Sequence, residues 1–230
     1  MDNSGVVMAE VAEKVQKIHT FTHKEKRVCT VVGKETPCLV ADVFKYCSSE
    51  YGIVEEQYSE SGELMHQIYI LRNEKCIMIV FPMCKKYTRI PLSEQILQKM
   101  TQLTPKGVVE MLLSDEHIKL GRNTFDGVEA EGFEITNSSM LTDIGKDVQY
   151  LCSIEGSVMR LWVDIDTSLP VGLEGELITG RGLLTGFQRL EINVTAFDIQ
   201  WDVELNDDIF KPNIPDDYTF INPNQQNSQN

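Results

Sequence analysis

The 230-residue sequence is poor in positive charge, with 21 Lys and Arg against 35 Asp and Glu and a formal net charge of −14. Proteins that bind phosphate backbones do so with clustered Lys and Arg, so this balance argues against a nucleic acid partner. The same charge argues against docking on a surface of anionic lipid headgroups. It does not oppose the binding of an acyl chain, because apolar burial decides that interaction.

Long hydrophobic runs are also missing. The most apolar stretch, Cys76 to Cys84, has nine residues and contains Pro82, whereas a helix needs about 18–20 apolar residues to span a bilayer. Residues 1–5 lack the basic region and the apolar core of a signal peptide. Either the protein stays in the cytoplasm or this segment begins after a leader or an anchor.

Catalytic and metal-binding motifs are equally scarce. The six cysteines include no CxxC pair, the four histidines form no HExxH motif, and no GxSxG elbow is present. A glycine-rich segment, 180–186, precedes a strand pattern instead of a helix, which indicates a hairpin loop and not a phosphate site. We therefore expect no enzyme, with no catalytic residue, no metal and no cofactor. We interpret the cysteines as buried thiols, although an oxidising compartment would permit disulfides.

Hydrophobic periodicity indicates an α+β protein. Apolar residues at helical spacing predict a helix over 8–18, and residues 92–114 predict two short helices, the second starting at Thr104-Pro105. Period-two segments predict strands near 24–32, 38–48, 51–58, 64–71, 75–81, 84–90, 117–122, 128–136, 147–155, 158–165, 170–179 and 187–203. The gaps between them are too short for βαβ crossovers and favour antiparallel hairpins.

Two segments predict unusual strands. In 75–81 both alternating sets are apolar, so this strand should be covered on both faces or should face a cavity on one. In 187–203 the apolar positions change parity: Ile192 and Val194 share one face, whereas Phe197, Ile199 and Trp201 share the other. A bulge or sharp bend is therefore expected there.

Two further segments predict a hairpin and a strap. Asp164 and Thr167 can close a tight turn before Pro170. Residues 207–218 form an extended strap whose Ile209, Phe210 and Ile214 should dock on the body. No linker divides the chain, so we predict one domain over residues 1–221 and a disordered polar tail over 222–230. The expected architecture is a single curved antiparallel sheet of about 10–11 strands, a half-barrel with helices on its concave face.

Four motifs in this order resemble the LolA/LolB-like outer-membrane lipoprotein-sorting superfamily, in a divergent branch, over residues 6–220. They are the helical Ala12-x-x-Val15-x-x-Ile18, the segment 85–89 before the helical insert, the hairpin Trp162-Val163-Asp164…Thr167…Leu169-Pro170, and the strap Phe210…Ile214-Pro215-Asp216…Tyr218. The resemblance implies an incomplete barrel capped by helices, with an apolar cavity between them that receives the acyl chains of lipoproteins crossing the periplasm.

The function that this resemblance implies is non-enzymatic binding of a lipid or a lipoprotein acyl chain in the cell envelope or periplasm, with a leader or anchor outside the present segment. The candidate cavity residues are Ile77, Ile79, Phe81, Leu161 and Val163; the alternative for each is plain core between sheet and helices. The partner is then a lipid or a lipidated protein. An alternative is an extracytoplasmic sensor or interaction domain of an anti-sigma type regulator, in which the same fold meets an envelope protein.

Overall fold

A computed structural model describes residues 5–101, 104–137, 141, 153–181 and 188–222 of the chain. Its strands are β1 (Thr20–Val31), β2 (Pro37–Ser48), β3 (Gly52–Ser59), β4 (Leu64–Leu71), β5 (Cys76–Phe81), β6 (Lys86–Pro91), β7 (Ile118–Phe125), β8 (Val128–Thr136), β9 (Ile154–Asp164), β10 (Pro170–Thr179), β11 (Leu190–Trp201) and β12 (Thr219–Phe220). Its helices are α1 (Met8–Gln16), α2 (Glu94–Thr101) and α3 (Pro105–Ser114), with 3-10 turns η1 (Pro82–Cys84) and η2 (Asp207–Phe210).

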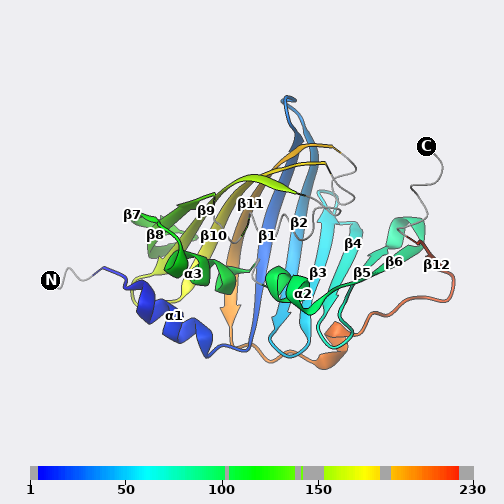
Figure 1. Ribbon diagram of the computed structural model, residues 1–230, viewed down its shortest axis with the longest axis horizontal. Coiled ribbons are helices and arrows are strands. Elements are labelled where there is room, and N and C mark those ends of the chain that lie inside the picture. Colours follow the sequence, from blue (N-terminus) through cyan, green and yellow to red (C-terminus); the bar gives the residue numbers. More distant parts are fainter. Residues whose placement is uncertain (1–4, 102–103, 138–140, 142–152, 182–187, 223–230) are drawn as a thin grey trace.

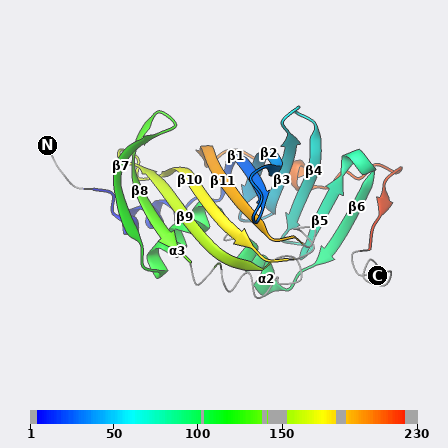
Figure 2. The same cartoon turned by 90° about the horizontal axis from the view of Figure 1, so that it is seen from above.

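All twelve strands belong to one sheet, in the order β12-β6-β5-β4-β3-β2-β1-β11-β10-β9-β8-β7. Neighbours are antiparallel except for the short β12, which pairs in parallel with β6. The chain makes one meander from β1 to β6 and a second from β7 to β11, and the two join where β1 pairs with β11. The sheet is curved and does not close, with β7 at one end and β6 and β12 at the other (Figure 2). The predicted α+β half-barrel is confirmed, with twelve strands in the described residues instead of the expected 10–11; the two-residue β12 was not expected.

The three helices lie over one face of the sheet, the concave one (Figure 1). Helix α1 contacts α3, and α3 contacts β8, β9 and β10. The side chains that the two helices turn towards the sheet are apolar: Met8, Val11, Ala12 and Val15 from α1, and Val108, Val109, Met111 and Leu112 from α3. Each large side chain buried in this way contributes about 1.5–3 kcal/mol. None of the described helices has the length and apolar character to cross a bilayer.

Helix α3 begins where the sequence predicts. Thr104 is its N-cap, and the threonine hydroxyl accepts a hydrogen bond from the backbone N–H of Gly107 at 3.3 Å. Pro105 takes the first helical position, where no intrahelical N–H bond is lost. The predicted pair of helices is thus observed as α2 and α3, both on the concave side.

The predicted irregularity in β11 is confirmed. The register between β1 and β11 shifts between Thr22 and Lys24, opposite Asp198, whose φ of 50° is left-handed. The extra residue on β11 turns its later side chains to the other face, which explains the change of parity in the sequence. The sequence predicted strands near 147–155 and 158–165. The break between them is wrong, because β9 is one continuous strand over Ile154–Asp164, and residues 147–152 lie outside the described residues.

The predicted hairpin and strap are both present. Asp164 accepts hydrogen bonds from the Asp166 N–H and the Thr167 hydroxyl, each at 2.8 Å, and Pro170 starts β10. The strap, residues 207–218, crosses the convex face of β3 to β6 and buries Phe210 against Tyr51, with ring centroids 5.5 Å apart. Of the predicted tail 222–230, only Asn222 lies among the described residues.

Candidate functional site

An apolar cavity of about 310 Å³ lies between the concave face of the sheet and the helices. Six isoleucines from four neighbouring strands form one wall: Ile53, Ile68, Ile70, Ile77, Ile79 and Ile90. Helices α2 and α3 cover it with Met100, Val108 and Met111, and β10 and β11 complete the floor. A volume of this size lies at the lower end of the range for small-molecule sites.

The isoleucine wall follows directly from strand register. Ile53 is opposite Ile70, Ile70 is opposite Ile77, and Ile77 is opposite Ile90, so one row crosses β3, β4, β5 and β6. Residues directly opposite each other across a sheet share a face, and β-branched side chains pack well on a pleated surface. Four strands therefore present one continuous apolar surface to the space below the helices.

The floor of the cavity owes its depth partly to Gly175 on β10, which has no side chain to fill it. A Cβ atom at this position would lie 3.1 Å from the flexible Met159 sulfur and 3.9 Å from Val194 Cβ. A larger residue would therefore project into the cavity without meeting backbone. This position offers a way to fill the cavity by mutation.

A buried ionic cluster borders the apolar walls at the centre of the sheet. Arg27 donates hydrogen bonds to Glu25 at 2.9 Å and to Glu55 at 2.8 Å, and Lys45 Nζ lies 2.7 Å from Glu25 Oε1. The four side chains expose 5–19% of their surface. Two acids and two bases balance one another, so the cavity contains a polar patch without net charge.

The charges of this cluster shift the pKa values of its two carboxylates. Burial alone would raise the pKa of Glu25, but Lys45, His23 and Arg27 hold that pKa well below its ordinary value. Burial would likewise raise the pKa of Glu55, and Arg27 and Lys45 lower it instead. Both carboxylates therefore stay ionised at neutral pH, where they bind the two cations.

His23 is attached to this cluster and is itself buried. Its Nε2 lies 3.0 Å from Glu25 Oε1, and its Nδ1 has no hydrogen-bond partner among the residues that the structure describes. Burial lowers the pKa of His23, against the raising effect of Glu25. The imidazole is therefore neutral at pH 7.

The structure separates the five cavity candidates named from the sequence. Ile77 and Ile79 line the cavity. Phe81 is partly buried and packs against the same core, but it does not line the cavity. Its ring lies edge-on to the His66 ring, with ring centroids 5.2 Å apart. Leu161 and Val163 on β9 have no exposed surface and lie in solid packing beside α3. Contact of any of the five with a lipid stays a prediction.

Sequence reasoning missed the ionic cluster, although a signal was present. On β1, Glu25 and Arg27 alternate in phase with the inward-facing Phe21 and Cys29. On β2, Lys45 stands between the inward-facing Val43 and Cys47. Charges at the inward positions of neighbouring strands are the pattern that would have predicted a buried pair network.

The cysteine interpretation holds in part. Cys29, Cys47 and Cys76 are buried free thiols, whereas Cys38 and Cys84 are exposed at a hairpin and at the η1 turn. Cys152 lies outside the described residues. Among the described residues, no three His, Cys, Asp or Glu side chains gather so as to hold a metal ion.

Comparisons with known proteins give similarity to solved structures only. No family model and no curated protein matches the chain. It is similar to LprF from Mycobacterium bovis, with 10% identity over 92% of this chain and 95% of that chain and a TM-score of 0.46. It is similar to lipoprotein LppX from Mycobacterium tuberculosis, with 12% identity over 90% of this chain and 99% of that chain and a TM-score of 0.47. It is also similar to a LolA superfamily protein from Nitrosomonas europaea, with 14% identity over 90% of this chain and 98% of that chain and a TM-score of 0.37.

Proposed function

We propose that this protein binds the acyl chain of a lipid or of a lipidated partner in the cavity between its sheet and its helices, and that it does so in the cell envelope without catalysing a reaction. The observation that carries the proposal is the cavity of about 310 Å³, walled by six isoleucines and covered by α2 and α3. A hydrocarbon chain that enters the cavity leaves water and contacts apolar side chains instead, and this burial of apolar surface is favourable.

Energetics favour reversible binding. Each buried methylene contributes about 0.8 kcal/mol, so a chain of about ten carbons contributes roughly 8 kcal/mol before losses. Lost translational freedom and ordering of the chain consume several kcal/mol of this. About 3–5 kcal/mol then remains for a ten-carbon chain, which corresponds to binding near the millimolar range and suits a protein that must also release its ligand.

The test uses a variant that fills the cavity. Gly175→Leu projects a side chain from β10 past Met159 into the open volume. A matched control is Gly156→Leu on the neighbouring β9, where a Cβ atom would meet nothing closer than 3.7 Å and the residue lies on the convex face. Both changes replace a strand glycine by leucine in the same sheet.

We expect the unmodified protein to bind a fluorescent fatty-acid probe and to retain lipid in native mass spectrometry. Gly175→Leu should weaken probe binding at least about tenfold, because the chain loses its volume, whereas Gly156→Leu should bind normally. A probe that binds neither variant differently from the unmodified protein, or that never binds, would refute the proposal.

The alternative role as a sensor or interaction domain stays a prediction. It requires no ligand in the cavity and a protein partner instead. Absence of lipid together with an unchanged affinity for such a partner in Gly175→Leu would favour it over lipid binding.

A further inference from the structure

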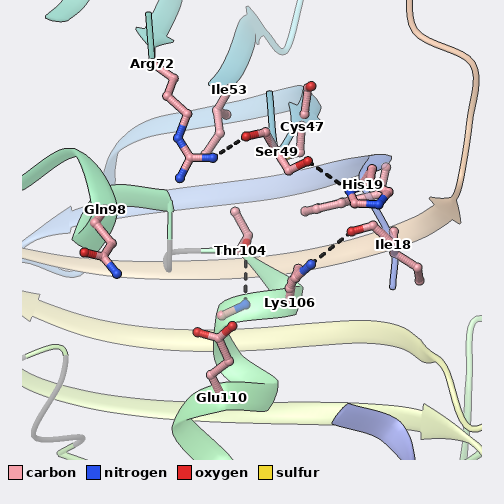
Figure 3. A pocket seen from close by; sticks show the side chains of 13 residues that line it. Ile18, His19, Cys47, Ser49, Ile53, Arg72, Gln98, Thr104, Lys106 and Glu110 are labelled. Atoms are coloured by element: carbon pink, nitrogen blue, oxygen red, sulfur yellow. Dashed lines mark hydrogen bonds between the residues drawn. The ribbon is translucent and has the colours of Figure 1, made fainter. Parts of the chain in front are cut away.

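A second pocket, of about 290 Å³, opens at the edge of the sheet where β1 and β3 begin and β2 and β4 end (Figure 3). Polar and apolar atoms contribute about equally to its lining, whereas the lining of the isoleucine cavity is mostly apolar. The basic groups that line it are Arg72, directly after β4, Lys106, in the first turn of α3, and His19, directly before β1.

Arg72 and Lys106 both donate hydrogen bonds to backbone carbonyls. Lys106 Nζ donates to the backbone carbonyl of Ile18 at 2.9 Å, and Arg72 donates to the carbonyl of Ser49. Among the residues that the structure describes, neither forms an ion pair with a carboxylate. Most other cations of this acidic protein are paired, as Arg27 is with Glu55.

Lys106 is also partly withdrawn from water. Burial lowers its pKa, against weaker raising effects of Glu110 and Asp202. A half-buried ammonium that lacks a counter-ion gains from an anion placed beside it, because the local dielectric constant is lower than in bulk water. The pocket is thus lined by two positive groups that form no ion pair within the described residues, although Lys106 Nζ also donates to the carbonyl of Gln16 at 3.4 Å.

The two pockets share a wall. Ile53 at the start of β3 lines both. Along α3, Gly107 and Glu110 border the polar pocket, whereas Val108 and Met111 border the apolar cavity. An amphiphile with its chain among the isoleucines could therefore place its polar end beside Arg72 and Lys106.

We infer that this pocket receives the anionic end group, a carboxylate or a phosphate, of the amphiphile whose chain occupies the cavity. The inference rests on the proposed function and adds the class of ligand to it. Repulsion by the net charge of −14 is screened beyond about 8–10 Å at physiological salt, whereas the two cations act at contact distance.

Glu110 should affect anion affinity in the opposite direction to Arg72 and Lys106. Its carboxylate lines the same pocket and would repel a bound anion. Replacing Glu110 by Gln should therefore tighten anion binding, whereas replacing the cations should weaken it. Loss of folding cannot produce a gain in affinity, so the pair of variants separates electrostatics from damage to the structure.

The experiment compares decanoate with decanol, which share a chain and differ in the charge of the end group. Binding is measured by displacement of a fluorescent fatty-acid probe at pH 7.5. The variants are the double change Arg72→Gln with Lys106→Gln, the single change Glu110→Gln, and a control, Lys34→Gln, in the exposed β1–β2 hairpin at the opposite end of these strands. Decyl phosphate and inorganic phosphate are tested as further ligands.

We expect the unmodified protein to prefer decanoate over decanol by about tenfold, and the double variant to lose most of this preference while binding decanol normally. Glu110→Gln should raise affinity for decanoate about two- to threefold, and Lys34→Gln should change nothing beyond about twofold. Decyl phosphate should behave as decanoate does.

Other outcomes overturn the inference in distinguishable ways. Equal binding of decanoate and decanol, unchanged in the double variant, would show a chain site without an end-group site. Saturable binding of inorganic phosphate alone, with no preference among the amphiphiles, would show a free-anion site unrelated to the cavity. If neither decanoate nor decanol binds, the proposed function itself fails.

Discussion

The two halves of the sheet use their faces in opposite ways. In the half made by β3 to β6, the concave side borders a cavity and the convex side is covered by the strap. In the half made by β8 to β10, the concave side packs against α3, and it reaches the cavity at the floor, through Gly175 and its neighbours on β9 and β10. The convex side of this half is polar, with Arg160 bound to Glu134 at 2.7 Å and to Glu176 at 2.6 Å. The hollow half is thus the half that has a second apolar layer outside.

The contrast explains how a sheet can hold a cavity. β5 has Ile77 and Ile79 on the concave side and Cys76 and Val80 on the convex side, and all four are buried. The strap supplies the convex side with packing that does not depend on the helices. The concave side can therefore leave volume unfilled while the strands stay in register.

The largest effect is expected at the seam between the halves, where β1, β2 and β3 hold the ionic cluster. Arg27→Met leaves Glu25 and Glu55 short of one cation in a buried setting and should lower the free energy of unfolding by about 3–5 kcal/mol. The matched control is Arg160→Met on the convex face. The side chains of its two ion pairs are 19–54% exposed, so this change should cost at most about 1 kcal/mol. Urea denaturation measures both costs, and equal costs would contradict a buried ionic network at this position.

The next effect compares solid packing with the cavity wall. Leu161→Ala, in the filled half, should cost about 4 kcal/mol, because a fully buried leucine leaves a new void. Ile79→Ala, at the cavity wall, should cost about 2 kcal/mol, because the side chain already faces open volume and loses fewer contacts. Denaturant midpoints in the absence of lipid measure the difference, and a larger cost for Ile79→Ala would mean that no cavity exists there.

A smaller effect depends on pH. Burial holds the pKa of His23 below its ordinary value, so the unfolded chain binds more protons once the pH falls below about 6.5. Stability should therefore fall between pH 7 and pH 5.5, by about 1 kcal/mol. The half-buried His66, whose pKa is also lowered by burial, adds to the same slope. Glu25 and Glu55, with lowered pKa values, lose their contribution only below about pH 4.3.

His23→Gln should flatten this slope while leaving the acid-induced loss below pH 4.3 in place. Thermal denaturation at pH 5.5 and 7 measures the change. A slope that His23→Gln leaves untouched would place the titrating group elsewhere.

The smallest effect concerns thiol access on the two sides of the hollow half. Cys76 lies under the strap, whereas Cys47 packs beside Phe21 and Ile53 on the concave side, where burial raises its pKa to about 12. Phe210→Ala loosens the strap and should speed labelling of Cys76 by a maleimide, with Cys47 unchanged. The exposed Cys38 and Cys84 should label first in every variant. Equal acceleration at Cys47 would indicate global unfolding instead of local release.

Much of this architecture could be predicted from residue patterns, because period and parity are local properties. The apolar sets on both faces of 75–81 predicted double cover or a cavity, and the parity change after Val194 predicted the bulge. The cavity wall could be predicted only in part, because it depends on register. Ile77 was a candidate, but Ile53 and Ile90 join it only once β3, β4, β5 and β6 pair in this order.

The polar pocket lay beyond sequence reasoning for a related reason. Arg72 and Lys106 are separated by 34 positions in the chain and come together only when the helical insert folds back over the sheet. The solid packing around Leu161 was equally hidden, since an inward-facing apolar residue has the same pattern whether a helix or open volume lies opposite.

Isotope-filtered NMR with methyl-labelled isoleucine is the most direct way to learn where a hydrocarbon chain resides in this protein. With decanoate added, we expect cross-peaks between chain protons and the methyl groups of Ile70, Ile77, Ile79 and Ile90, and none to Ile209 or Ile214 in the strap. Cross-peaks confined to the strap, or none at any isoleucine under saturating decanoate, would contradict it.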